Sequence, residues 1–152
     1  MGGHSFRSYL TTNRFEVDTR LNKCIGDLKV EGMSGEAKFA IVKFKHELSK
    51  VLDDIGSFRK QVLASIEKPE GLDELRTKVL TNAATEEEKA KFEVIKKEYT
   101  DKCAAVALPY FSEEIAVPFE FISEEDFKSL LSHNDINTVE DYEYLYSKLV
   151  KK

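Results

Sequence analysis

Two short runs of acidic side chains are the first candidates for chemistry in this sequence. They are Glu86–Glu88 and Glu124–Asp126, and neighbouring carboxylates are the ligands that Mg²⁺ and Ca²⁺ prefer. Each run also stands where a helix is expected to begin, and carboxylates in a first turn stabilise the helix dipole and cap free amides. The capping interpretation is favoured for both runs, so the sequence predicts no metal ligands.

Other known catalytic motifs are not matched by the sequence, and in each near match one required residue is missing or misplaced. The run Gly32–Gly35 has its serine at Ser34, which does not fit the G-x-S-x-G elbow and is better explained as a helix cap. His46-Glu47 is followed by Lys50 where a zinc protease needs a second histidine. The chain has no Gly-rich phosphate loop and no Glu-x-x-His pair. Structural or solvent roles are favoured for His4, His46 and His133, and free thiols for Cys24 and Cys103. No catalytic residue and no cofactor is predicted.

Composition and charge limit the partners. The 152 residues are 41% hydrophobic and 34% charged, which suits one small soluble domain of amphipathic helices. The net charge is +3 over residues 1–66, −2 over residues 67–108 and −6 over residues 109–152. An acidic C-terminal third repels phosphate backbones, so no nucleic-acid partner is expected. The sequence has no apolar run of 18 residues and no secretory signal, so no membrane partner is expected and a reducing compartment is the default.

The N-terminal part predicts an arm, a strand, a short helix and then one long helix. Residues 1–13 form the arm, a period-two pattern predicts a strand near Arg14–Val17, and a helix is expected over Arg20–Leu28. Ser34 is expected to cap a helix over residues 34–66. The apolar positions of this helix follow a heptad seam: Ala37, Ile41, Phe44, Leu48, Val51, Ile55, Phe58 and Val62. This seam is expected to be the core of an intrachain helical hairpin.

A second long helix is predicted over residues 85–108. A short helix over Leu72–Leu80 precedes it, Thr85 and Glu88 fit a capping box, and Pro109 is expected to end it. Residues 109–152 predict a small knob, with an alternating strand over residues 115–121 and two short helices capped by Ser123 and Thr138.

These elements predict a mainly α (α+β) fold. We expect one domain over residues 14–152, in which a long antiparallel helical hairpin carries a small knob of short strands and short helices. In the knob, the strand near Phe15 is expected to pair with the strand near Phe119.

A protein-binding surface is predicted from apolar residues that the seam does not use. In the arm these residues are Phe6, Tyr9 and Leu10, which could anchor it to its own domain or to an assembly. Phe39 and Val42 add apolar faces beside the seam, where the helix packs on the knob or on another subunit. Tyr144 is expected to point outward from the last helix, and exposed tyrosine is favoured at interfaces.

Four pieces of the sequence carry a resemblance to a known family. They are an N-terminal strand with a short helix, the run Leu28–Gly35 leading into a Lys-rich helix, a second long helix, and the ending Glu114–Phe127. Over about residues 14–150 their order resembles small uncharacterised proteins encoded among the structural genes of tailed bacteriophages. Those proteins often have a Gly-containing β-hairpin between the long helices, whereas residues 69–84 here predict a short helical connection. The resemblance implies a phage origin and a role in particle structure or infection, and it implies no catalytic residues.

The leading hypothesis is a non-enzymatic phage virion or assembly protein that acts by protein–protein contact, in the host cytoplasm or the virion. Its partner would be another protein or further copies of itself. The alternative is a phage-encoded inhibitor or regulator whose acidic surface binds a host protein. A small enzyme or metal-binding module using the acidic runs is the third reading.

Overall fold

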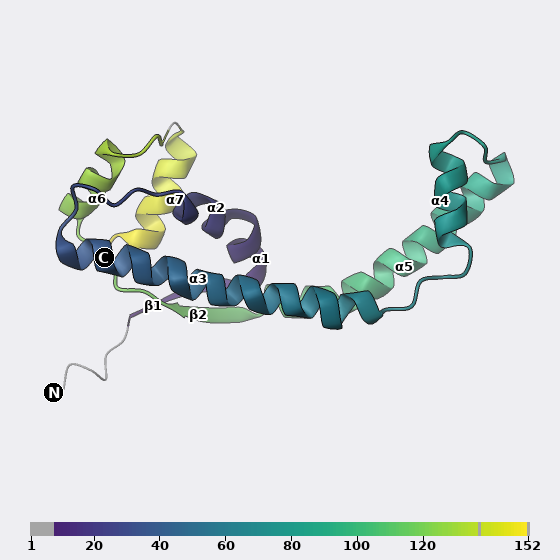
Figure 1. The fold of residues 1–152 in the computed structure, drawn as a ribbon, viewed down its shortest axis with the longest axis horizontal. Helices are drawn as coiled ribbons and strands as arrows, with labels where there is room; N and C mark the ends of the chain where they lie inside the picture. The colour runs from purple at the N-terminus through teal and green to yellow at the C-terminus, as the bar shows by residue number, and fades with distance from the viewer. Residues whose placement is uncertain (1–7, 137, 152) are drawn as a thin grey trace. The chain divides into compact units, whose positions relative to one another are not determined.

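The computed structural model describes residues 8–136 and 138–151 (Figure 1). In chain order the elements are β1 (Tyr9–Asn13), α1 (Arg14–Glu16), the π-helix η2 (Val17–Leu21), α2 (Asn22–Gly26), α3 (Gly35–Gln61), the 3₁₀ helix η3 (Leu63–Ser65), α4 (Leu72–Leu80), α5 (Glu86–Ser112), β2 (Glu114–Pro118), α6 (Glu124–Ser132) and α7 (Val139–Leu149). This confirms the predicted mainly α fold with a small antiparallel sheet. The chain divides into two compact units: residues 1–55 with 112–152 form unit 1, and residues 56–111 form unit 2.

The sheet of unit 1 pairs β1 with β2 in antiparallel register, Leu10 opposite Val117. The predicted pairing of an N-terminal strand with the one after the second long helix is therefore right, but the N-terminal strand was placed too late. It lies within the predicted arm, and Phe15 is helical. The reason is Asn13, whose side chain accepts a 2.7 Å hydrogen bond from the amide of Glu16 and starts a helix there.

One helical run follows β1 without a break, from Arg14 to Gly26. Its residues Val17, Leu21 and Ile25 are fully buried and four apart, which places them on one face. The predicted helix over Arg20–Leu28 is therefore real but begins six residues earlier and ends at Gly26.

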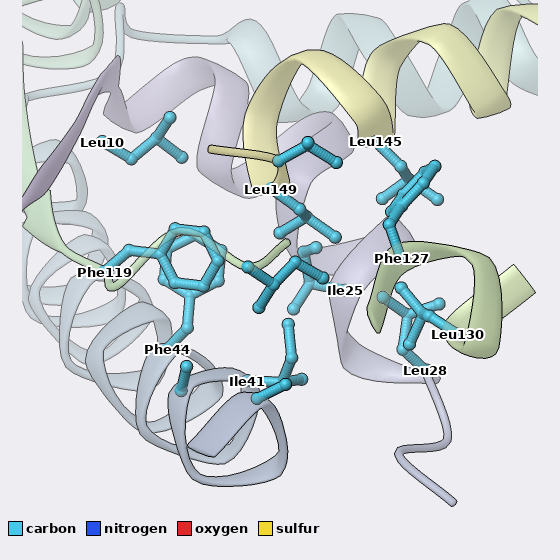
Figure 2. Packing of buried hydrophobic residues seen from close by; sticks show 14 of the residues in the cluster. Leu10, Ile25, Leu28, Ile41, Phe44, Phe119, Phe127, Leu130, Leu145 and Leu149 are labelled. Carbon is cyan, nitrogen blue, oxygen red and sulfur yellow. The ribbon is translucent and has the colours of Figure 1, made fainter. Parts of the chain in front are cut away.

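The first half of α3 packs along one side of the unit 1 core. Ser34 accepts a 3.2 Å hydrogen bond from the amide of Ala37, as its role as cap predicts. From the seam, Ile41, Phe44 and Leu48 are buried against the strands, the N-terminal helical run, α6 and α7 (Figure 2). The ring of Phe44 lies 4.3 Å from that of Phe119, centroid to centroid. This half of the seam therefore packs into the knob and not into a helical hairpin, and α3 itself ends at Gln61 rather than at residue 66.

Unit 2 contains α4, α5 and the end of α3. Leu72, Leu75 and Phe92 are its buried apolar side chains in the described part of the chain, and Val79, Ile95 and Tyr99 pack against them. The bounds of α4 match the predicted short helix. The capping box is confirmed: the amide of Thr85 donates to Glu88 over 2.9 Å, and the amide of Glu88 donates to the Thr85 hydroxyl over 3.1 Å.

The second long helix continues past Pro109 to Ser112, so the predicted stop was wrong. A proline inside a helix removes one amide donor and crowds the preceding turn. Here the next two residues have a packing partner, because the ring of Tyr110 stacks on Phe58 at 3.9 Å and Phe111 meets Phe58 edge-on at 6.0 Å. These ring contacts stabilise the last turn after the proline.

Candidate functional site

The predicted interface residues fall into three structural groups. Phe6 lies outside the described residues. Tyr9 is exposed on β1, whereas Leu10, on the opposite face of the same strand, is buried in the unit 1 core. The structure therefore uses Leu10 to anchor the chain to its own domain. Phe39 and Val42 are exposed, with 67% and 54% of their surface open.

Tyr144 does not point outward, contrary to the prediction. It is half-buried, its hydroxyl donates a 2.7 Å hydrogen bond to Glu16, and the guanidinium of Arg20 lies 3.8 Å from the centre of its ring. Lys148 lies 3.1 Å from the same carboxylate, and Thr12 donates to its other oxygen. The contacts join β1, the N-terminal helical run and α7, so this cluster holds unit 1 together.

Burial and the polar contacts of this cluster shift the pKa values of Glu16 and Tyr144. Burial alone raises the pKa of Glu16, but the hydrogen bonds from Thr12, Tyr144 and Lys148 outweigh burial and hold that pKa below its ordinary value. Burial and the neighbouring Glu16 carboxylate both raise the pKa of the Tyr144 phenol. Glu16 is therefore held ionised and Tyr144 neutral, which is the state that preserves their hydrogen bond.

A pocket of about 580 Å³ lies beside α2, between the loop before α3 and the start of α7, and Cys24 and His133 line it. Burial raises the pKa of the Cys24 thiol, and the Asp141 carboxylate raises it further, which works against a reactive thiolate. Nδ1 of His133 lies 2.9 Å from the carbonyl oxygen of Ser129 and 3.0 Å from the Ser132 hydroxyl. Nδ1 of His133 is thus directed at the end of α6, and burial and Asp141 both disfavour the Cys24 thiolate.

The polar side chains beside this pocket fasten the loop before α3 to α6. Asn134 accepts a 2.8 Å hydrogen bond from the amide of Lys29 and donates one of 2.9 Å to the carbonyl of Lys29. Asp126 accepts hydrogen bonds from the amide and the hydroxyl of Ser34, at 2.9 and 3.0 Å. The amide of Ser34 is the main cause of the lowered pKa of Asp126.

Both acidic runs lie in the first turn of a helix, as predicted, where Glu88 takes part in the capping box of α5 and Ser123 caps α6. Asp126 donates its amide to Ser123 over 3.1 Å, while Glu88 completes its capping box and pairs with Lys78 at 2.6 Å. Within residues 8–136 and 138–151, no three His, Cys, Asp or Glu side chains are grouped so that they could hold a metal ion.

Unit 1 carries two apolar surfaces that are open to a partner. We call the first the α3 face, formed by Phe39 and Val42 with Lys38 and Lys43 beside them. The second, which we call the α6–α7 groove, is a hollow of about 240 Å³ lined by Glu124, Phe127, Lys128, Tyr142 and Tyr146. The sequence predicts the Phe39 and Val42 pair of the α3 face but does not predict the groove, because its lining comes from two separate helices.

Unit 2 exposes apolar side chains that sequence reasoning also missed. Val94 and Leu108 on α5 are 58% and 65% exposed, and Leu80 at the end of α4 is exposed as well. Val94 lines a shallow hollow of about 450 Å³ together with Glu93, Lys96, Lys97 and Thr100. The sequence does contain a signal for this exposure, because Val94 and Leu108 do not follow the helical spacing of the core-facing apolar residues in α5.

In the described part of the chain no helix combines the length and apolarity that crossing a membrane requires. Exposed apolar side chains on both units are the candidate functional features of the chain. The phage resemblance stays a prediction from the sequence. Comparison with family models finds no match, and neither the curated proteins nor the solved structures include one significantly similar to this chain.

Proposed function

We propose that this chain is a non-enzymatic bacteriophage protein that acts by protein–protein contact, as a component of the particle or of its assembly. The observation that carries the contact role is the exposure of Val94 and Leu108 on α5, in a unit whose buried core holds three apolar side chains among the described residues. So small a core contributes little stability by itself. A partner that covers the exposed side chains would add the missing apolar burial, at roughly 25 cal/mol per Å².

The phage assignment is supported by the resemblance of residues 14–150 to proteins encoded among phage structural genes. It places the protein in the host cytoplasm during assembly or in the finished virion. The engagement of Tyr144, Glu16 and Asp126 in contacts within unit 1 agrees with a non-enzymatic role, because these titratable groups serve the fold.

Quantitative mass spectrometry of purified particles tests this proposal. Particles are compared after replacing the gene with Val94→Asp or with a matched control, Ser57→Asp, which adds the same charge at an exposed position of unit 2 outside the hollow that Val94 lines. We expect Val94→Asp to lower the copy number per particle by about tenfold, the loss that a disrupted contact worth about 1.4 kcal/mol produces, and Ser57→Asp to leave it unchanged. Particles that lack the wild-type protein, and that form with the same yield and infectivity when the gene is deleted, would refute the proposal.

A further inference from the structure

The α3 face is apolar at its centre and basic at its edges. Phe39 and Val42 are one turn apart on the side of α3 opposite the buried seam. Residues 35–50 carry four lysines and two glutamates. Lys38 and Lys43 flank the apolar pair, and neither ammonium group forms an ion pair within the described residues. A surface of this kind fits an acidic partner with apolar or aromatic side chains at its centre.

The α6–α7 groove has the opposite character. The rings of Tyr142 and Tyr146 are nearly parallel, 6.2 Å apart and 17° from coplanar, and the buried ring of Phe127 meets both edge-on. Val139, which is 72% exposed, extends this apolar strip toward the start of α7. Of the residues that line the groove, Glu124 is acidic and Lys128 is basic, and the exposed carboxylates of Glu125 and Glu143 stand next to lining residues in α6 and α7, so the surrounding of the groove is acidic.

The two surfaces belong to one unit but face different directions. The α3 face points away from the unit 1 core, whereas α6 and α7 pack on the buried side of α3 (Figures 1 and 2). The α3 face of one chain therefore cannot reach the groove of the same chain. Its apolar centre and positive edges nevertheless complement the aromatic, negative groove, and this points to contact between copies.

We propose that the α3 face of one copy docks in the α6–α7 groove of a second copy, with Phe39 and Val42 against Tyr142 and Tyr146. The inference rests on the proposed contact function and names its partner as the chain itself. Lys43 then lies in the negative field of residues such as Glu143. Because the two surfaces differ, the contact is head-to-tail, and every added copy leaves one free surface of each kind. Such a contact builds a ring where its rotation closes and a filament where it does not.

Complementation between single-surface variants tests this geometry. Phe39→Glu removes the α3 face and leaves the groove, while Tyr142→Glu removes the groove and leaves the α3 face. Light scattering behind a sizing column measures mass up to on the order of 100 μM, a range that detects weak contacts. We expect wild-type mass to rise above 17.4 kDa with concentration and each variant alone to stay at 17.4 kDa. A mixture of the two variants is expected to give a dimer that grows no further.

A second pair of variants tests the same contact in case the first pair does not fold. Lys43→Glu changes an exposed side chain of the α3 face, and Glu143→Lys changes an exposed side chain next to Tyr142 of the groove. Each is expected to weaken association about tenfold or more, and the double variant is expected to recover it in part. Circular dichroism verifies that each variant is folded.

Two outcomes overturn the inference. Self-association of Tyr142→Glu alone would mean that the contact does not use the groove. A wild type that stays monomeric throughout would mean that no second copy occupies the groove. The second result leaves the contact function standing if Val94→Asp still lowers incorporation into particles, so the two failures are distinguishable.

Discussion

The hydroxyl of Tyr144 donates a 2.7 Å hydrogen bond to the carboxylate of Glu16, across 128 residues of sequence. Glu16 belongs to the first helical turn after β1, and Tyr144 to the last helix of the chain. This bond therefore joins the two ends of unit 1, and Lys148 and Thr12 complete the set of partners around the carboxylate.

Removing the hydroxyl of Tyr144 is expected to destabilise the protein. Tyr144→Phe keeps the ring under Arg20 but leaves the half-buried Glu16 with one donor fewer. A hydrogen bond to a charged group contributes about 1.5–3 kcal/mol, so we expect a loss near the lower end in urea unfolding. The control is Tyr142→Phe, whose ring is partly exposed and whose loss is expected to stay below about 0.5 kcal/mol. Equal losses in the two variants would contradict the role of the Glu16 hydrogen bond.

Local signals in the sequence were sufficient for the helix caps. Ser34, Thr85, Ser123 and Thr138 all accept the predicted hydrogen bonds, because a cap joins groups only three residues apart. The core-facing positions of α3 were also predictable, since their periodicity depends on one helix alone. What covers them depends on distant segments, and for this reason the partner predicted for the first half of the seam is wrong.

The structural features that the sequence did not predict depend on contacts between residues far apart in the chain. The turn after Pro109 is helical because Phe58 stacks on Tyr110, and nothing near the proline signals that contact. Tyr144 was expected outside because its partner, Glu16, is far away in sequence. The α6–α7 groove depends on the packing of two helices, which residue patterns along either one do not specify.

The stability of unit 1 is expected to fall in acid partly through Glu16. Folding lowers the pKa of the Glu16 carboxyl, so the stabilisation that Glu16 contributes is complete above its pKa in the unfolded chain and is lost as the pH falls through its pKa in the folded protein. Glu16→Gln is therefore expected to narrow the difference in unfolding free energy between about pH 7 and about pH 3. Glu140→Gln, at an exposed carboxylate of α7, should leave that difference unchanged. An unchanged difference in Glu16→Gln would show that other carboxylates cause the acid sensitivity.

Gly32 is expected to tolerate no side chain. Its φ of +82° strains other residues, and an added Cβ would lie 2.4 Å from Cε1 of His133. Gly32→Ala should therefore cost about 1–3 kcal/mol in unfolding free energy, and adding His133→Ala should recover the part that comes from the clash. Gly35→Ala is the matched control, because at the first position of α3 its Cβ meets nothing within 4 Å. A harmless Gly32→Ala would mean that the loop before α3 is not fixed against α6.

Unit 2 is expected to open separately from unit 1. Its buried core in the described residues is Leu72, Leu75 and Phe92, so truncating one of them removes a large share of its apolar burial. Phe92→Ala is expected to cost about 3–5 kcal/mol locally. Hydrogen exchange followed by mass spectrometry should then show faster exchange in α4 and the first half of α5, with residues 35–48 of α3 still protected. Val94→Ala, at an exposed position of α5, should change neither region. Faster exchange of residues 35–48 in Phe92→Ala would instead mean that the two units unfold together, which would contradict separate opening of unit 2.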